Sequence, residues 1–130
     1  MEIRFGGGVI QDFTRLDVWQ RAHLMTLDLY RKTKLFPREE TYGLTNQIRR
    51  AASSIGANIA EGCGREGEAE LGRFLQIALG SASELQYHLL LARDLAYVPP
   101  GDYEPLAAEV TGVKKMLTSL VQKVRAAAAS

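Results

Sequence analysis

The sequence predicts an all-α protein, an antiparallel up-down-up-down four-helix bundle. Apolar residues recur at steps of three and four along most of the chain, which is the spacing of one face of an α-helix. Proline is absent between Pro37 and Pro99, and the Val- and Ile-rich alternation typical of strands is missing. Four helical segments of about 20 to 29 residues, joined by short turns, are expected to pack around one core.

The chain has 130 residues, of which 46% are hydrophobic, and this suits one domain with its own core. We expect a flexible N-terminal lead-in over residues 1–14, because Gly6–Gly8 favour a mobile chain, and a bundle over residues 15–127. The net charge of +1 does not by itself recruit nucleic acid or a membrane. A single cysteine, Cys63, and the lack of a bilayer-length apolar run predict a cytoplasmic protein with no membrane partner.

The first helix is predicted over residues 16–35, with Asp17 as its N-cap and Phe36-Pro37 as its end. Its apolar stripe consists of Val18, Ala22, Met25 and Leu29. The second helix is predicted over residues 42–61. Its apolar face carries Leu44, Ile48, Ala51, Ile55 and Ile59. Gly56 lies inside it at a cost of about 1 kcal/mol relative to alanine, so it is expected to serve a bend or close packing.

The third and fourth helices carry the cleanest seams, with a period of 3.5 residues. The third is predicted over residues 68–96. Its seam runs through Leu71, Leu75, Ala78, Ala82, Leu85, Leu89, Ala92 and Ala96. The fourth is predicted to begin at Asp102, as a cap, and to continue to about residue 127. Its seam runs through Tyr103, Leu106, Val110, Val113, Leu117, Leu120 and Val124.

Residues 62–67 read GCGREG, which fits the G-x-G-x-x-G pattern of a dinucleotide-binding turn. Such a turn needs a strand before it, whereas the residues before Gly62 have a helical pattern. We therefore interpret the stretch as a helix end and turn. Gly62 or Gly64 is expected to end the second helix in a left-handed conformation, and Gly67 to loosen the turn. The flanking glutamates favour the start of the third helix and repel phosphate there.

Polar stripes flank the apolar faces of the second and third helices. If these helices fold back on each other near residue 67, facing residues have numbers that sum to about 134. That register pairs Arg50 with Glu84 and Glu61 with Arg73, and it sets residues 51–54 against residues 80–83. We expect these ion pairs to fix the register of the hairpin. The alternative is that both stripes are solvated surfaces.

The sequence offers no constellation typical of an active site or a metal centre. Di-iron bundles use Glu-x-x-His spacing, and the nearest match, Glu84 with His88, is one residue longer. Cys63 lies in a turn with no histidine near it in sequence, and the serines lack a visible base and orienting acid. We therefore expect no enzymatic activity, no catalytic residue, no metal, no cofactor and no small-molecule substrate.

Five short stretches of the chain are recognisable together. They are VWQRA (18–22), FPREETYGL (36–44), QIRRAASSI (47–55), NIAEG (58–62) and GSASEL (80–85). Over residues 13–124 the sequence resembles the bacterial four-helix-bundle family of proteins encoded in intervening sequences of ribosomal RNA genes. It is also similar to the accessory variability determinants of retroelements. Gly56 stands where the family often has proline. The resemblance implies an antiparallel bundle that assembles as a ring-like homopentamer, and for some members an association with nucleic acid or ribonucleoprotein.

Two functions stay open. The first is a homo-oligomeric, pentameric scaffold associated with RNA or other nucleic acid, including a ribonucleoprotein partner. Its candidate nucleic-acid-binding residues are Arg31, Lys32, Lys34, Arg38, Arg49, Lys114, Lys115, Lys123 and Arg125. The alternative is a protein–protein interaction module that binds no nucleic acid. Its candidate contacts, for a partner or a second subunit, are Trp19, Tyr30, Phe36 and Tyr42, because aromatic residues are enriched in interface cores.

Overall fold

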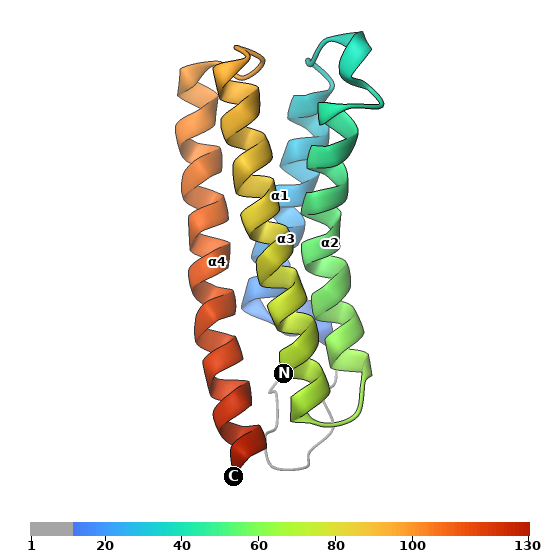
Figure 1. Ribbon diagram of the computed structural model, residues 1–130, viewed down its shortest axis with the longest axis vertical. Coiled ribbons are helices and arrows are strands. Elements are labelled where there is room, and N and C mark those ends of the chain that lie inside the picture. The colour runs from blue at the N-terminus through green and yellow to red at the C-terminus, as the bar shows by residue number, and fades with distance from the viewer. Residues whose placement is uncertain (1–11) are drawn as a thin grey trace.

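The protein forms four helices, seen in a computed structural model that describes residues 12–130. They are α1 (Asp17–Thr33), α2 (Leu44–Gly64), α3 (Glu68–Asp94) and α4 (Pro100–Ala129). Two short 3-10 turns, η1 (Phe13–Arg15) and η2 (Arg38–Glu40), precede α1 and α2. The helices stand side by side as an elongated bundle (Figure 1). The prediction of an all-α four-helix bundle is confirmed. Most of the predicted lead-in falls on residues 1–11, which lie outside the described residues.

Contacts between consecutive helices join residues whose numbers rise on one helix as they fall on the next. Between α1 and α2 these pairs are Trp19 with Gly56 and Thr33 with Arg49. Between α2 and α3 they are Ser54 with Ser81 and Gly62 with Leu71. Between α3 and α4 they are Gly72 with Val124 and Gln86 with Lys114. Neighbouring helices in these pairs therefore run in opposite directions, as the colour gradient also shows (Figure 1). The α2–α3 contacts also confirm the predicted register of that hairpin.

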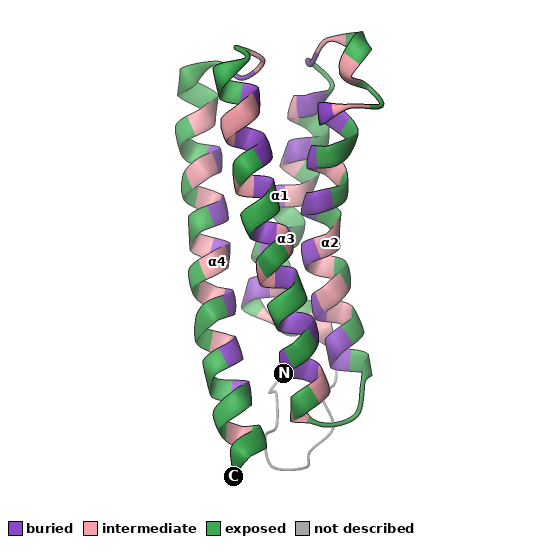
Figure 2. Cartoon of the chain, viewed as in Figure 1, coloured by how far each residue is buried: buried purple, intermediate pink, exposed green. Residues whose placement is uncertain are grey.

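The apolar stripes of all four helices meet in one core (Figure 2). Every stripe residue predicted for the first two helices is buried, and so is the third seam as far as Ala92. Three details differ from the prediction. Ala96 lies beyond the end of α3 and is exposed. On α4, Tyr103 and Leu120 are only partly covered, and Val121 is buried. The helical period thus located the core, with errors of one residue or one turn near the ends.

Two helix starts differ from the predicted caps. Leu16, with extended backbone, is the N-cap of α1, so Asp17 is the first helical residue. Pro99 is the N-cap of α4 and Pro100 begins the helix, so Asp102 lies within the first turn. A proline suits the first helical position because its missing N–H would have no partner there. Asp17 and Asp102 still favour the helix dipole from the first turn.

The glycine stretch is a helix end and turn, but the left-handed residue is Gly67, with φ of 85°, and not Gly62 or Gly64. Gly62 stays helical and is buried. The close approach of α3 explains the glycine, since a Cβ there would come within 2.9 Å of the Phe74 Cβ. Gly64 is the last residue of α2, and Arg65 after it is extended. No strand precedes the stretch anywhere in residues 12–130. The dinucleotide-binding interpretation therefore has no structural support.

Candidate nucleic-acid interface

The outer surface of α4 is basic and polar over its last twenty-odd residues. After Glu109 the sequence contains no aspartate or glutamate up to Ser130. Val110, Val113 and Leu117 occupy the buried face, and we call the basic and polar side chains on the outer faces of this part of the helix the α4 strip. The strip consists of Thr111, Lys114, Lys115, Thr118, Ser119, Gln122, Lys123 and Arg125. No carboxylate of α4 itself lies after Glu109 to offset the four cations of the strip.

A shallow hollow of about 440 Å³ follows the middle of the strip, and every side chain that lines it is polar. The hollow extends from Thr111 to Gln122 on α4, and Gln86 completes it from α3. The Lys114 ammonium donates a hydrogen bond of 2.9 Å to the Gln86 side-chain oxygen. Lys114 is thereby held against α3, while Lys115 makes no ion pair with any residue from 12 to 130.

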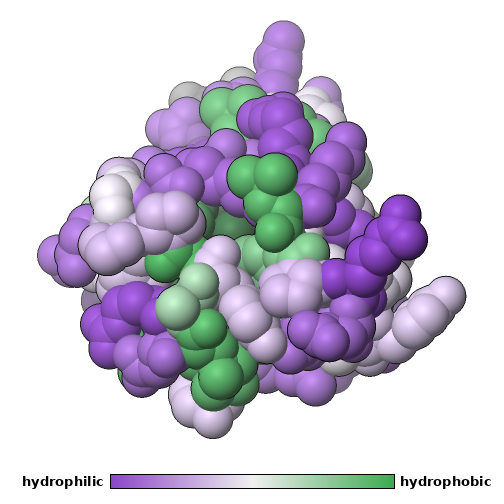
Figure 3. Space-filling view, turned by 90° about the horizontal axis from the view of Figure 1, so that it is seen from above, coloured by the Kyte–Doolittle hydropathy of each residue, from purple (hydrophilic) through white to green (hydrophobic). Residues whose placement is uncertain are grey.

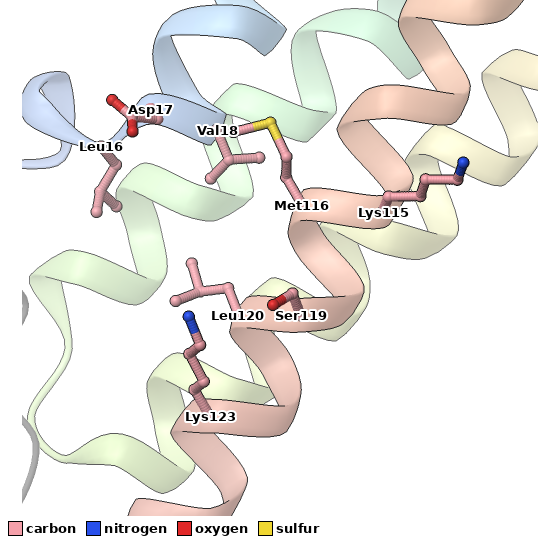
Figure 4. A pocket seen from close by; sticks show the side chains of 8 residues that line it. All are labelled: Leu16, Asp17, Val18, Lys115, Met116, Ser119, Leu120 and Lys123. Carbon is pink, nitrogen blue, oxygen red and sulfur yellow. The ribbon is translucent and has the colours of Figure 1, made fainter.

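A second hollow, of about 470 Å³, lies between the start of α1 and the strip. Leu16, Asp17 and Val18 line one side of it, and five residues of α4 line the other, namely Lys115, Met116, Ser119, Leu120 and Lys123 (Figure 4). The Lys123 side chain rises toward Leu120, whereas Lys115 extends away from Asp17 (Figure 4). Lys115 and Ser119 line both hollows, so the two hollows adjoin along α4, and Asp17 is the one acidic residue among residues 12–130 that lines them.

The other basic residues predicted for nucleic-acid binding lie at the opposite end of the bundle from Lys123, around the end of α1 (Figure 1). Lys32 is paired with Asp28 at 2.9 Å. Arg49 donates to the Thr33 hydroxyl at 2.9 Å and to the Tyr30 carbonyl at 3.2 Å, and its guanidinium lies over the Tyr30 ring. Arg31, Lys34 and Arg38 are exposed. The nine candidates therefore form two separate groups, and only the α4 group is free of acidic neighbours in sequence.

The four aromatic residues predicted for interfaces lie in different places in the fold. Phe36 is only 9% exposed and packs against the Tyr97 ring, so it belongs to the core. Tyr42 is 94% exposed in the connection between α1 and α2. Trp19 stacks on His23 at a centroid distance of 4.8 Å and lies over Gly56. This contact explains the glycine inside α2, since a Cβ there would come within 3.3 Å of the Trp19 indole nitrogen.

Trp19 and Tyr30 share a groove of about 450 Å³ on the outer side of α1 and α2, which we call the aromatic groove. Phe13, His23 and Leu27 contribute to its walls. Small residues of α2 complete its lining, namely Ser53, Gly56, Ala57 and Ala60. The groove is mostly apolar and lies on the surface, a composition typical of a site that another protein chain covers.

The polar stripes of α2 and α3 meet at the predicted register but without the predicted ion pairs. Arg50 and Glu84 line the same hollow, yet no nitrogen–oxygen distance within 4.0 Å joins them. Glu84 accepts from His88 on its own helix at 3.2 Å, depending on the histidine tautomer. Partners three or four residues apart on one helix are closer than partners across the gap.

The second predicted pair behaves in the same way. Glu61 pairs with Arg65 at 3.2 Å, and Arg73 pairs with Glu70 at 2.9 Å. The hydrogen bond from Arg73 lowers the pKa of Glu70 below its usual value. Both pairs lie within single helices, so neither joins α2 to α3. Hydroxyl groups make the polar contact between these helices, with the Ser54 and Ser81 oxygens 2.9 Å apart.

The remaining chemistry-bearing side chains are held in the fold. Cys63 is buried, and burial raises the pKa of its thiol to about 11. Within residues 12–130, no three histidine, cysteine or acidic side chains gather where they could hold a metal ion. Across the same span, no helix combines the length and apolar character needed to cross a membrane.

Reasoning from individual basic residues missed the hydroxyl and amide groups of the strip. Thr111, Thr118, Ser119 and Gln122 line the same hollows as the lysines, and Gln86 joins them from α3. The signal was present in the sequence as the long interval after Glu109 without an acidic residue. A count of net charge over the whole chain hides this local asymmetry.

The comparisons with known proteins agree on the family. The family model described as 23S rRNA-intervening sequence protein matches residues 14–119. A crystal structure of a protein of unknown function from the S23 ribosomal protein family of Bacteroides thetaiotaomicron has a TM-score of 0.75 and 28% identity, covering 81% of this chain and 95% of that one. No curated protein sequence matches. The chain therefore belongs to the 23S rRNA-intervening sequence protein family.

Proposed function

We propose that this protein is a non-enzymatic, homo-oligomeric scaffold that associates with RNA in the cytoplasm, and that it contacts RNA through the α4 strip. The observation that carries the proposal is that four basic residues follow Glu109 on α4 and no acidic residue does. Lysine and arginine that neutralise phosphates release counterions, which supplies most of the affinity in nucleic-acid binding that is not sequence-specific. Hydroxyl and amide groups between the cations add hydrogen bonds to sugar oxygens.

The aromatic groove supports the oligomeric part of the proposal. It presents Trp19, Leu27 and Tyr30 on the surface beside small residues of α2, which allow close approach of another helix. The family resemblance favours a ring of five copies. Five strips on one assembly would bind one RNA with far greater avidity than a single strip, because each additional contact is intramolecular.

Binding of a labelled RNA, measured against salt concentration, tests the RNA association. Retention at low salt that falls steeply as salt rises is expected. The double variant Lys115→Ala/Lys123→Ala should bind more weakly and reduce the slope of log affinity against log salt by about 1.4 to 1.8. The matched control is Arg31→Ala/Lys34→Ala at the other end of the bundle, which should retain the wild-type slope. No RNA retention at low salt would refute the association.

Light scattering tests the oligomer. A mass of five chains is expected for the wild type, and Leu27→Glu should shift it toward the monomer, because Leu27 is 40% exposed in the aromatic groove. Leu24→Glu is the control, since Leu24 is 65% exposed on the same helix but does not line the groove. A monomeric wild type would exclude the ring.

The second candidate function is a protein-interaction module without nucleic acid. Exposed apolar and aromatic side chains at one end of the bundle favour it. Leu35 is 85% exposed and Tyr42 is 94% exposed in the connection between α1 and α2. An apolar hollow of about 240 Å³ lies beside Leu35, between Phe36, Tyr97 and Leu106. Figure 3 views this end and shows hydrophobic surface among the polar side chains. Capture of a protein partner that survives Lys115→Ala/Lys123→Ala, together with absence of bound RNA, would favour this function.

A further inference from the structure

We propose that the α4 strip recognises the backbone of double-stranded RNA and discriminates against single strands. This inference rests on the proposed function, and it names the form of RNA that the strip takes. Three features carry it: the strip has no surface for base stacking, it lies on one uninterrupted helix, and its cations are interleaved with groups that donate and accept hydrogen bonds.

Stacking surfaces are missing from the strip. Proteins that hold single strands without sequence preference combine a basic groove with aromatic side chains on which the bases stack. The sequence of α4 contains no aromatic residue after Tyr103, and the Arg93 guanidinium lies over the Tyr103 ring at 4.9 Å. Tyr87 is exposed on α3, but it lines neither hollow of the strip. An unpaired base at the strip would thus leave its faces in water.

The spacing of the two lysines suits a rigid ligand that carries phosphates on both sides of a groove. Lys115 and Lys123 are eight residues apart, which is about 12 Å along a helix axis. Both lie on one uninterrupted helix, so the separation of their backbone positions is set before binding. A duplex presents phosphates at fixed positions on the two sides of a groove, and a rigid helix face meets them without ordering the ligand. A single strand would lose conformational freedom to do so.

The polar groups between the cations favour RNA over DNA. Thr118 and Ser119 carry hydroxyls, and Gln122 carries an amide, and all three are exposed between the two lysines. The wide, shallow minor groove of duplex RNA displays 2′-hydroxyl groups, which both donate and accept hydrogen bonds. Duplex DNA lacks them. The strip therefore combines phosphate contacts at its ends with 2′-hydroxyl contacts at its centre.

The test compares three labelled ligands of one sequence of about 20 nucleotides per strand: duplex RNA, one of its strands, and duplex DNA. Anisotropy titrations at low salt are expected to show at least about tenfold tighter binding of duplex RNA than of the single strand, with duplex DNA in between. A single strand that binds as tightly as the duplex would overturn this inference while leaving RNA association intact. If none of the three binds, the proposed function itself fails. Equal binding of the two duplexes would overturn the role given to the 2′-hydroxyl.

A hydroxyl-deletion variant separates the two kinds of contact. Thr118→Ala/Ser119→Ala removes two exposed hydroxyls that make no hydrogen bond within residues 12–130, so the fold is expected to be unaffected, with circular dichroism as the check. Its affinity for duplex RNA should fall about threefold or more, with no change for duplex DNA. Lys115→Ala/Lys123→Ala should weaken binding to both duplexes. Equal losses for both duplexes in the hydroxyl variant would contradict the assignment of these groups to 2′-hydroxyl contacts.

Discussion

The side-chain oxygens of Ser54 on α2 and Ser81 on α3 lie 2.9 Å apart and link the two helices by a hydrogen bond. Asn58 extends this contact, since its amide donates to the Ser54 hydroxyl at 2.9 Å and to the Ser54 carbonyl at 2.8 Å. Small side chains on both helices allow the close approach. The polar contact that marks this register is therefore a hydroxyl network where residues 51–54 face residues 80–83, and not either of the predicted ion pairs.

A double-mutant cycle at these serines is expected to show coupling. Ser81→Ala removes one partner and should lower the free energy of unfolding by about 0.5 to 1.5 kcal/mol. Ser54→Ala should cost more, because Asn58 also loses an acceptor. The double variant should cost less than the two single costs added together, by about 0.5 to 1.5 kcal/mol. Urea unfolding measures all three, and additive costs would mean that the contact contributes nothing.

Replacing Gly62 with alanine is expected to destabilise the protein, although alanine is the better helix former. The new Cβ would lie 2.9 Å from the Phe74 Cβ and 3.1 Å from a Leu71 methyl group, so α2 and α3 must separate. Overpacking of this kind costs about 1 to 3 kcal/mol. Gly80→Ala is the control, because nothing lies within 4 Å of its added Cβ. That variant should gain up to about 1 kcal/mol, and the two thermal shifts should have opposite signs.

Ala96→Gly is expected to stabilise the protein. Ala96 has φ of 62° after the end of α3. The Ala96 N–H donates to the Arg93 carbonyl and the Tyr97 N–H donates to the Ala92 carbonyl, each at 2.9 Å, which is the Schellman pattern of a helix end. Glycine adopts this conformation without a Cβ clash and should gain about 1 kcal/mol. The midpoint of urea unfolding measures the gain, and a loss of stability would contradict it.

The helical elements and the core could be predicted because periodicity records which face each helix buries. All nine stripe residues predicted for the first two helices are buried. Their spacing is regular because each of them must face the same core. The register of α2 against α3 followed from the position of the turn near residue 67, which sets small residues opposite small residues. These features depend on many positions at once, so no single residue could obscure them.

Features that depend on one or two side chains could not be predicted as well. Glu84 faces Arg50 in register, but it pairs with His88 because the distance along one helix is shorter. Phe36 has the sequence context of a surface turn, yet the turn folds back and packs it on Tyr97. Ala96 occupies a left-handed position that usually holds glycine. Each outcome depends on rotamers and loop geometry that a periodic pattern does not contain.

Cys63 is expected to react slowly with thiol reagents in the folded protein. The side chain is 3% exposed, and burial raises its thiol pKa from 9.0 to about 11, so the reactive thiolate is about a hundredfold scarcer at neutral pH. A chromogenic disulfide reagent at pH 8 should label it at a rate limited by opening of the fold. Addition of urea above the unfolding midpoint is the control and should restore the rate of a free thiol. Fast labelling without urea would mean that the end of α2 opens readily.

Glu40 joins three parts of the chain at one end of the bundle. The Tyr97 hydroxyl donates to one of its carboxylate oxygens at 2.8 Å, and the Leu44 N–H at the start of α2 donates to the other at 3.1 Å. The hydrogen bond from the Leu44 N–H, and to a smaller extent the one from the Tyr97 hydroxyl, lowers the pKa of Glu40 below its usual value. The same contact with Glu40 raises the pKa of Tyr97. The ionised carboxylate and the neutral phenol are therefore the forms that the folded protein favours.

Glu40→Gln is expected to lower stability at neutral pH and to have less effect in acid. Because the pKa of Glu40 is lower in the folded state, its contribution is complete above the unfolded value, about 4.3, and is lost as pH falls through the lower folded value. The gap in melting temperature between wild type and variant should thus be widest near pH 7 and close below about pH 4. Glu39→Gln is the control, since Glu39 accepts no hydrogen bond from residues 12–130 and should show no such closing gap. A gap that stays constant down to pH 3 would show that the carboxylate charge adds nothing to these two hydrogen bonds.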